Sequence, residues 1–166
     1  QAKLIYGNNC IAHLDGLKDL MHGVKKLLAK DGIFVLECNY WGGMVSNTNY
    51  SLIYHDHFSY FSIEVWKKFA KQYNLHPFDA VVTPAQGGSL RLFLSNNKKR
   101  KYTKRFIELE KKEKQNKLNT YETSLQYRAN VKNESNVLKN LVNNLLSKGK
   151  SVAGYGAAAK GMTILK

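Results

Sequence analysis

The sequence of 166 residues predicts an α/β fold, and three observations support this. An apolar run, an amphipathic stretch and a second apolar run follow one another over residues 3–37, which is the spacing of one parallel βαβ unit. Two shorter apolar runs flank a glycine-rich turn over residues 78–94, which is typical of an antiparallel hairpin. Helical periodicity then continues over residues 102–146. We therefore expect a partial sheet, a long helical segment and the start of a second α/β unit.

The βαβ unit is predicted element by element. Residues 3–7 form a short apolar run ended by glycine, which predicts a strand. Residues 33–37 form a continuous apolar run of the kind found in buried parallel strands. Residues 14–30 place apolar side chains at helical spacing, and Asp31-Gly32 is expected to close that helix. The apolar positions of the helix are Leu17, Leu20, Met21, Val24, Leu27 and Leu28.

The middle of the chain contains one more helix and the hairpin. Ser62 is a favourable cap for a helix over residues 63–73, whose apolar stripe includes Trp66. Residues 78–83 and 89–94 are rich in strand-forming side chains, and a Pro-Ala-Gln-Gly-Gly turn joins them. We expect these two strands to form an antiparallel pair at the edge of the sheet.

The helical segment carries most of the charge. The chain has a net charge of +14, but residues 1–97 hold nine Lys and Arg against seven Asp and Glu, whereas residues 98–150 hold 15 against five. We expect the helical run to break at residues 119–120 or at Asn133 and to end at residues 148–149. A basic helix can bind nucleic acid or an anionic surface. A solvated helix face is the interpretation we favour, and nucleic acid is not an expected partner.

The last residues read as a strand, a glycine turn and the beginning of a helix, over residues 151–161. This is the opening of a second nucleotide-binding-like unit. A lone strand and helix start cannot bury their own faces, and the chain begins at Gln1 without methionine. We therefore expect the chain to be part of a longer protein.

Cysteine usage and hydropathy narrow the class of protein. Cys10 and Cys38 each stand alone in apolar stretches, which argues against a disulfide framework and a cysteine-based zinc site. This usage fits a reducing compartment, so we expect a cytoplasmic protein. The longest apolar runs are shorter than 18 residues, so the sequence predicts no membrane span.

Titratable side chains gather in the loop of about twenty residues that follows the second strand, and long loops of this kind are usually functional. The loop contains Tyr54-His55-Asp56-His57. One histidine could act as a general base oriented by a carboxylate, with a tyrosine as donor to a developing oxyanion. A metal site is the second interpretation, although histidines two residues apart suit it poorly. The third is an aromatic loop that simply packs.

Two further positions allow both a functional and a structural interpretation. His13 follows the first strand at the same end of the sheet as the histidine-containing loop, and could belong to the site or serve as a capping or core histidine. Gly154 and Gly156, with Lys160, could cradle a phosphate, since small residues let backbone N–H groups approach it. The same residues could form a tight strand–helix turn.

Four motifs give the sequence a recognisable family resemblance. They are Asn-Asn-x-x-Ala-His at residues 8–13, Tyr-His-Asp-His-x-Ser-Tyr-Phe-Ser at residues 54–62, Gly-Gly-Ser-Leu-Arg at residues 87–91 and Gly-Tyr-Gly-Ala-Ala-Ala-Lys-Gly at residues 154–161. The sequence resembles the sugar C-methyltransferases, which use S-adenosylmethionine to methylate a carbon of a nucleotide-linked keto-deoxysugar. These motifs occur in order along nearly the whole chain.

The resemblance implies a domain organisation. Residues 1–97 resemble the C-terminal half of a Rossmann-like class I methyltransferase domain. Residues 98–150 would be a basic helical connector, and residues 151–166 the start of a C-terminal nucleotide-binding domain. In the family, a zinc-binding region lies upstream, so zinc would belong to the longer protein, and we expect no metal ligands in this chain.

The resemblance also implies roles for single residues. His57 matches the base that removes a proton from the sugar carbon, and Tyr54 and His13 match active-site positions that assist it. Asp56 stands where glutamate is more usual in this motif. The enolate carbon would then attack the methyl group of the donor in line. Residues expected to border the donor are Asn8 and Asn9, and those expected to bind the substrate are Ser89, Arg91, Gly154, Tyr155, Gly156 and Lys160.

Two other functions stay open from the sequence. One is a related methyltransferase that acts on another acceptor, such as an amine or a small acid. The other is a nucleic-acid or anionic-surface binding module built on residues 98–150.

Overall fold

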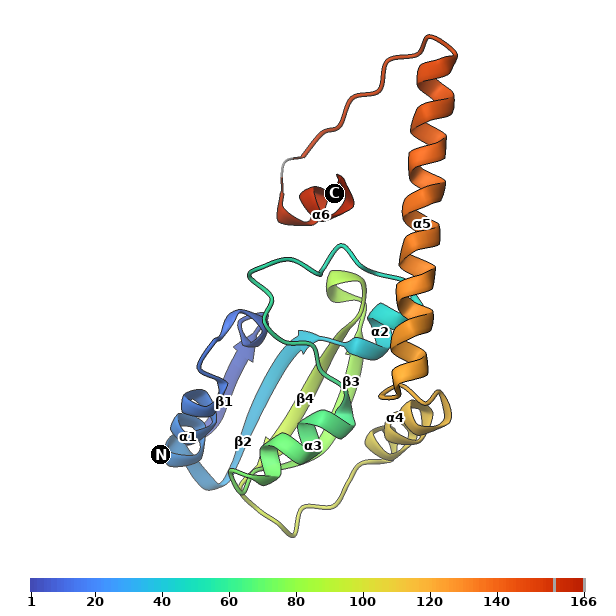
Figure 1. Ribbon diagram of the computed structural model, residues 1–166. Helices are drawn as coiled ribbons and strands as arrows, with labels where there is room; N and C mark the ends of the chain where they lie inside the picture. The colour runs from blue at the N-terminus through green and yellow to red at the C-terminus, as the bar shows by residue number, and fades with distance from the viewer. Residues whose placement is uncertain (157, 166) are drawn as a thin grey trace.

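The computed structural model describes residues 1–156 and 158–165 and shows a mixed four-stranded sheet, with helices packed on it and one long helix that extends away (Figure 1). The strands are β1 (Ala2–Asn8), β2 (Leu28–Asn39), β3 (His76–Thr83) and β4 (Ser89–Ser95). The helices are α1 (Leu17–Leu27), α2 (Trp41–Ser46), α3 (Ile63–Lys71), α4 (Lys104–Gln115), α5 (Tyr121–Ser147) and α6 (Ala159–Leu165), with short 3-10 helices η1 (Ile11–His13) and η2 (Ala85–Gly87). This arrangement confirms the predicted α/β class.

The strand order of the sheet is β1-β2-β4-β3. Strands β1 and β2 are parallel and are joined through α1, as the βαβ prediction requires. Strand β4 is antiparallel to both β2 and β3, which confirms the hairpin. The pair occupies one edge of the sheet, as predicted, with β3 as the edge strand and β4 inside it. Leu90, Leu92 and Leu94 of β4 are all completely buried.

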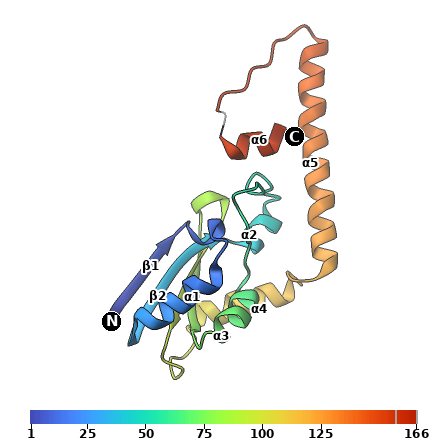
Figure 2. The same ribbon diagram turned by 60° about the vertical axis from the view of Figure 1, so that its left-hand side comes forward.

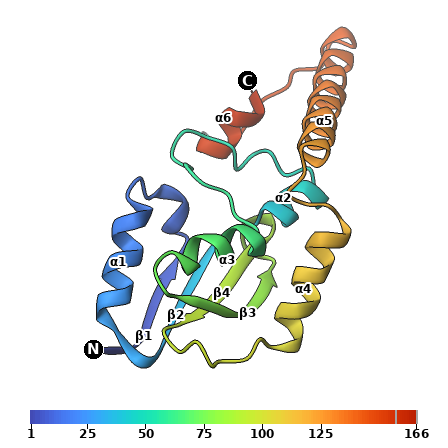
Figure 3. The same cartoon turned by 60° about the horizontal axis from the view of Figure 1, so that its bottom comes forward.

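Helices α1 and α3 cover one face of the sheet, and the core lies between them and the strands (Figure 3). Its largest fully buried side chains include Trp66 of α3, Phe34 of β2 and Phe106 of α4. Alternate residues of β1 face opposite sides, so Ile5 packs against this core while Leu4 and Tyr6 are exposed on the other face.

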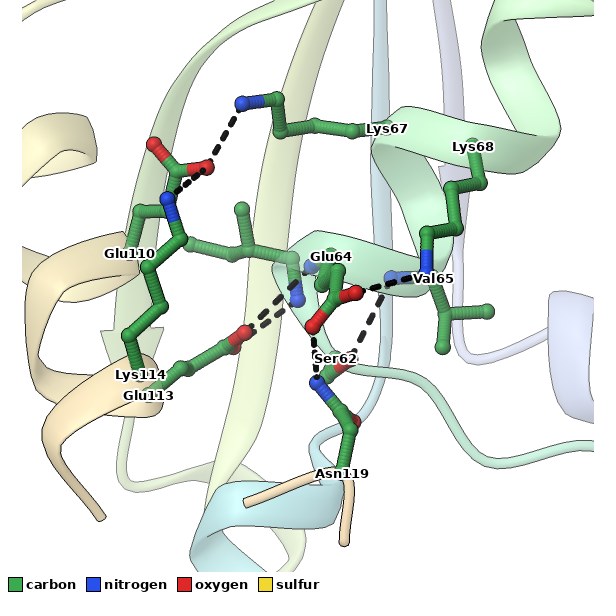
Figure 4. A network of polar contacts seen from close by, with 10 residues as sticks. Ser62, Glu64, Val65, Lys67, Lys68, Glu110, Glu113, Lys114 and Asn119 are labelled. Atoms are coloured by element: carbon green, nitrogen blue, oxygen red, sulfur yellow. Dashed lines mark hydrogen bonds and ion pairs between the residues drawn. The ribbon is translucent and has the colours of Figure 1, made fainter. Parts of the chain in front are cut away.

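The start of α3 is held by two acceptors from different parts of the chain (Figure 4). The backbone N–H of Val65 donates to the Ser62 hydroxyl oxygen at 3.3 Å, which confirms the predicted cap. The buried carboxylate of Glu113 in α4 accepts from the backbone N–H groups of Ile63 at 2.8 Å and Glu64 at 3.3 Å. Because free N–H groups at a helix start need acceptors, Glu113 fixes α4 to α3.

The helical region divides at the first of the two predicted positions. Helix α4 ends at Gln115, and α5 begins after Thr120, whose hydroxyl accepts from the backbone N–H of Thr123 at 3.3 Å. Asn133 lies inside α5, which ends one residue before Lys148. Most of α5 stands away from the sheet and exposes its side chains to solvent (Figure 2).

The boundary between α1 and β2 differs from the prediction. Helix α1 ends at Leu27, and Leu28 already pairs with Ala2 of β1. The register then shifts, and Gly32 comes so close to the neighbouring strand that a Cβ atom would lie 2.8 Å from the Ala2 carbonyl oxygen. Asp31-Gly32 therefore forms part of an irregularity at the start of β2 and does not close the helix.

Two other expectations need correction. The residues after the second strand were expected to form a loop of about twenty residues, yet the first of them form α2. Residues 151–161 were expected to begin with a strand, but residues 151–156 have no secondary structure, because no strand of the described chain lies beside them to pair with. Ala157, which belongs to the last motif, lies outside the described residues.

Candidate active site

The carboxyl ends of the parallel strands β1 and β2 meet at one edge of the sheet, where sites of α/β folds are usually found. Strand β1 leads into η1, which ends at His13, and β2 ends at Asn39. Residues 47–62, here called the histidine loop, follow α2. The backbone N–H of Phe58 donates to the Ala12 carbonyl oxygen at 2.8 Å, which ties the histidine loop to η1. Two motifs far apart in the sequence are thereby brought together.

His57 lies at the centre of this edge. Its Nδ1 atom is 2.8 Å from the carbonyl oxygen of Leu52 and 3.0 Å from the carboxamide nitrogen of Asn39. Its Nε2 atom is 2.8 Å from the hydroxyl oxygen of Tyr54, whose ring stacks at a centroid distance of 4.0 Å. Because a carbonyl oxygen only accepts, Nδ1 carries the proton of the neutral ring. The lone pair is then on Nε2, where it accepts from the Tyr54 hydroxyl.

The surroundings keep both groups uncharged near neutral pH. Burial lowers the pKa of His57 and outweighs the hydrogen bond to the Leu52 carbonyl, which raises it, and the positive charge of Lys160 acts in the same direction as burial. Burial, and then the negative charge of Asp56, raise the pKa of Tyr54. His57 is therefore available as a base, and Tyr54 keeps the proton that it can donate.

His13 is the second imidazole of the site. Its ring centroid lies 4.7 Å from that of His57. Its Nδ1 atom is 2.9 Å from the backbone carbonyl oxygen of Asp56, so by the same reasoning Nδ1 donates and the neutral ring keeps its lone pair on Nε2. The two histidines thus share one mode of orientation, in which a backbone carbonyl sets the tautomer.

The carboxylate of Asp56 faces another histidine. One of its oxygens lies 3.0 Å from Nε2 of His55, and both of these side chains are largely exposed. The contact of Asp56 with the site is made by its backbone carbonyl oxygen, through His13. A catalytic role for the Asp56 carboxylate stays a prediction.

A cavity of about 70 Å³ opens beside His57. It is lined by Asn9, Ala12, His13, Cys38, Asn39, Tyr54, His57 and Gln86. Asn9 has a positive φ of 52° and donates its backbone N–H to the Glu37 carbonyl oxygen at 2.9 Å. Asn8 is the last residue of β1, paired with Glu37 in the sheet. The structure therefore places Asn9 at the cavity and Asn8 just behind it.

Ser89 and Arg91, which were expected to bind the substrate, point to protein partners. The hydroxyl of completely buried Ser89 donates to the Ala85 carbonyl oxygen at 2.9 Å. The guanidinium Nε of Arg91 donates to the buried carboxylate of Glu37 at 2.8 Å. The structure does not bring either side chain to the cavity.

The residues of the last motif, 154–161, lie in two different surroundings. The ammonium of Lys160 donates to the carboxamide oxygen of Gln86, which lines the cavity. The Thr163 hydroxyl also donates, to the Ile53 carbonyl oxygen at 3.3 Å, so α6 lies against the histidine loop (Figure 2). Gly154, Tyr155 and Gly156 are exposed in the segment before α6. Of these four expected substrate-binding residues, Lys160 alone is near the cavity.

Comparison with known proteins now decides the family. A family model described as C-methyltransferase C-terminal domain matches residues 84–166. The chain is also 30% identical, over 168 aligned residues and 99% of its length, to "C-methyltransferase NovU" of Streptomyces niveus. The chain belongs to the C-methyltransferase family. The alignment covers 39% of NovU, so this chain spans about two fifths of the length of that relative.

A C-methyltransferase needs a methyl donor, and the cavity beside His57 can border one but is too small to enclose it. The cavity is well below the roughly 300–1,000 Å³ of typical small-molecule sites. Within residues 1–156 and 158–165, no group of three His, Cys, Asp or Glu side chains could hold a metal ion. In the same part of the chain, no helix has the length and apolar character needed to cross a bilayer.

Four contributors to this candidate site were missed by the sequence reasoning. They are the side chains of Asn39, Tyr60 and Gln86 and the carbonyl oxygen of Leu52. Asn39 carried a signal, because it directly follows a buried parallel strand, where site residues are common. Tyr60 was considered only as a packing residue, and it donates to the Leu52 carbonyl oxygen at 3.1 Å. Every residue has a backbone carbonyl, so residue types do not reveal which carbonyl oxygen will face His57.

Proposed function

We propose that this chain is part of an enzyme that transfers a methyl group from S-adenosylmethionine to a carbon of a nucleotide-linked keto-deoxysugar. In this proposal, His57 is the general base. The observation that carries it is the neutral imidazole whose Nδ1 is held by the Leu52 carbonyl, and whose Nε2 lies 2.8 Å from the Tyr54 hydroxyl. A base with a free lone pair beside a phenol donor suits proton removal from a carbon acid.

The proton moves from carbon to nitrogen in this scheme. The C–H bond next to the ketone breaks, a bond to the proton forms at Nε2 of His57, and the electron pair moves to the ketone oxygen. When the ketone enters, the Tyr54 hydroxyl turns from Nε2 to that oxygen and stabilises the enolate. The acidic carbon and the oxygen are two bonds apart, so one substrate can reach both groups across their 2.8 Å separation.

The nucleotide-linked substrate is supported by charge near the cavity. Lys160 contacts Gln86 at the cavity wall, and an ammonium there is suited to a phosphate group of the substrate. The resemblance of the four motifs to the sugar C-methyltransferases points to the same class of acceptor. S-adenosylmethionine, when bound, supplies an electrophilic methyl group, and Asn9 is the residue of this chain that would border it.

Two histidine variants of the whole protein test the base. We expect His57→Ala to lower methyl transfer by about 10²- to 10⁴-fold, because a positioned general base contributes that much. His55→Ala is the matched control, since His55 is exposed and pairs only with a neighbouring carboxylate at the surface. The measurements are methyl transfer and deuterium exchange at the carbon next to the ketone, with a panel of nucleotide-linked keto-deoxysugars.

The two measurements separate the parts of the proposal. Deuterium exchange without the donor reports proton removal alone, so it should be lost in His57→Ala and kept in His55→Ala. Unchanged exchange in His57→Ala would refute the assignment of the base. If the wild-type protein neither exchanges nor methylates any member of the panel, the proposed substrate class is wrong.

A further inference from the structure

The side chain of Asn39 is a buried polar group that the strand itself does not require. Asn39 is the last residue of β2, its backbone is paired with Ser89 of β4, and only 4% of its surface is exposed. Its carboxamide nitrogen lies 3.0 Å from Nδ1 of His57. A buried carboxamide needs a hydrogen-bond partner. Because Nδ1 of the neutral ring carries the proton, the carboxamide oxygen of Asn39, brought to this position by a half-turn of the last torsion, is the group that accepts from it.

We propose that Asn39 is a positioning residue, which holds the ring of His57 so that Nε2 faces Tyr54 and the cavity. This inference rests on the proposed function of His57 as the base. A ring held by a single hydrogen bond can still turn about its two side-chain torsions. Leu52 approaches Nδ1 from the histidine loop and Asn39 approaches it from the sheet, so the two together restrict the ring.

The two partners of Nδ1 differ in chemistry. The Leu52 carbonyl only accepts, so it stabilises the ring only when Nδ1 carries a proton. The carboxamide of Asn39 exchanges its oxygen and nitrogen by a half-turn of its last torsion, so it can accept from Nδ1–H or donate to a bare Nδ1. Asn39 can therefore hold the ring in both tautomers and in the protonated form that follows proton removal.

The location of Asn39 on a paired strand supports its role in positioning His57. A residue on a paired strand is held more precisely than a residue on a loop. Leu52 lies in the histidine loop, and its carbonyl oxygen also accepts from the Tyr60 hydroxyl. Asn39 thus links the base to the sheet directly.

Variants of the whole protein separate a positioning role from a purely structural one. Asn39→Leu keeps the approximate size but removes the hydrogen bond, and we expect kcat to fall by about 10- to 100-fold with an unchanged KM, since misplacing a catalytic group costs this much. Asn97→Leu is the matched control, because Asn97 bonds to Asp31 beyond the opposite end of β4. It should retain wild-type kcat.

Asn39→Asp supplies a second readout. A carboxylate accepts only and carries a charge, so it favours Nδ1–H and the cationic ring. The charged and titratable groups that already face His57 are His13, Tyr54, Asp56, Tyr60 and Lys160. Since these are unchanged in the variant, we expect the acid limb of the kcat–pH profile to move up by about one pH unit. Nitrogen-15 NMR of His57 should show the corresponding change in its titration.

The outcomes distinguish this inference from the proposed function. If Asn39→Leu has wild-type kcat and wild-type nitrogen-15 shifts at His57 while His57→Ala is inactive, the positioning role is refuted and the base is retained. If His57→Ala is fully active, the base assignment fails, and NMR still tests whether Asn39 orients the ring. Should Asn39→Leu not fold, Asn39→Asp, which keeps the size and polarity, decides the question: an unmoved pH profile overturns the proposal.

Discussion

Removal of one oxygen atom at Tyr54 tests the proposed enolate stabilisation. Tyr54→Phe keeps the ring that stacks on His57 at 4.0 Å and deletes the hydroxyl 2.8 Å from Nε2. Because the aromatic packing is conserved, the loss is confined to one hydrogen-bond donor. A single donor to a developing oxyanion is worth about 10²- to 10³-fold in kcat, or about 2.7–4 kcal/mol, and this is the decrease we expect.

The pH dependence of the same variant gives an independent measurement. In the wild-type protein, the Tyr54 hydroxyl donates to Nε2 and so stabilises the neutral form of His57. Without this donor, protonation of the ring becomes easier, and the pKa of His57 rises. The acid limb of the kcat/KM profile should therefore shift to higher pH in Tyr54→Phe, while Tyr121→Phe, an exposed control on α5, should keep the wild-type profile.

Two results would refute this reasoning. Wild-type turnover by Tyr54→Phe at every pH would show that the hydroxyl does not stabilise the enolate. A loss of turnover accompanied by a clear fall in melting temperature would show a structural role. The phenyl ring of the variant is expected to pack on His57 as the phenol ring of Tyr54 does, so the melting temperature should otherwise be unchanged. Deuterium exchange at the substrate carbon separates these cases, since a folded variant that lacks the donor should exchange slowly.

Two further predictions concern stability. Burial raises the pKa of Glu113, so its contribution to stability is present below the unfolded pKa and is lost as the pH rises through the folded pKa. The melting temperature of Glu113→Gln relative to wild type should therefore rise with pH, and a constant difference from pH 4 to 8 would contradict this. Burial by itself would raise the pKa of Asp79, but hydrogen bonds from Arg105 and Thr103 outweigh it and hold the pKa low. The contribution of Asp79 to folding stability is therefore present above the unfolded pKa and is lost as the pH falls through the folded pKa. We expect Asp79→Asn to cost about 1–2 kcal/mol in urea unfolding near pH 7 and progressively less in acid; equal stability near pH 7 would contradict this.

The features that the sequence predicted well depend on local interactions. The cap of α3 needs only Ser62 and the N–H of Val65, three residues later, and the break after α4 needs only Thr120 and its neighbours. The position of β4 inside the sheet depends instead on pairing with β2, about 55 residues earlier along the chain. Long-range pairing of this kind is not encoded in the periodicity of either strand.

The same distinction holds in the candidate active site. The contact between Tyr54 and His57 joins residues of one motif, and the motif suggested it. The contact of His57 with Asn39 joins a loop to a strand end 18 residues away, and it follows only from the fold. The position of Lys160 at the cavity wall also follows only from the fold, because α6 folds back on the histidine loop.

The two histidines of the candidate site show which groups orient the rings in the structure. Sequence reasoning looks for a carboxylate to orient a catalytic imidazole, and Asp56 was the candidate next to His57. In the structure, each Nδ1 faces a backbone carbonyl oxygen, that of Leu52 for His57 and that of Asp56 for His13. A backbone carbonyl carries no net charge, so its hydrogen bond fixes the tautomer and raises the pKa of His57 by less than burial lowers it. The histidine loop thus orients both rings through its backbone, while burial favours the uncharged form of His57, which is the state that a general base requires.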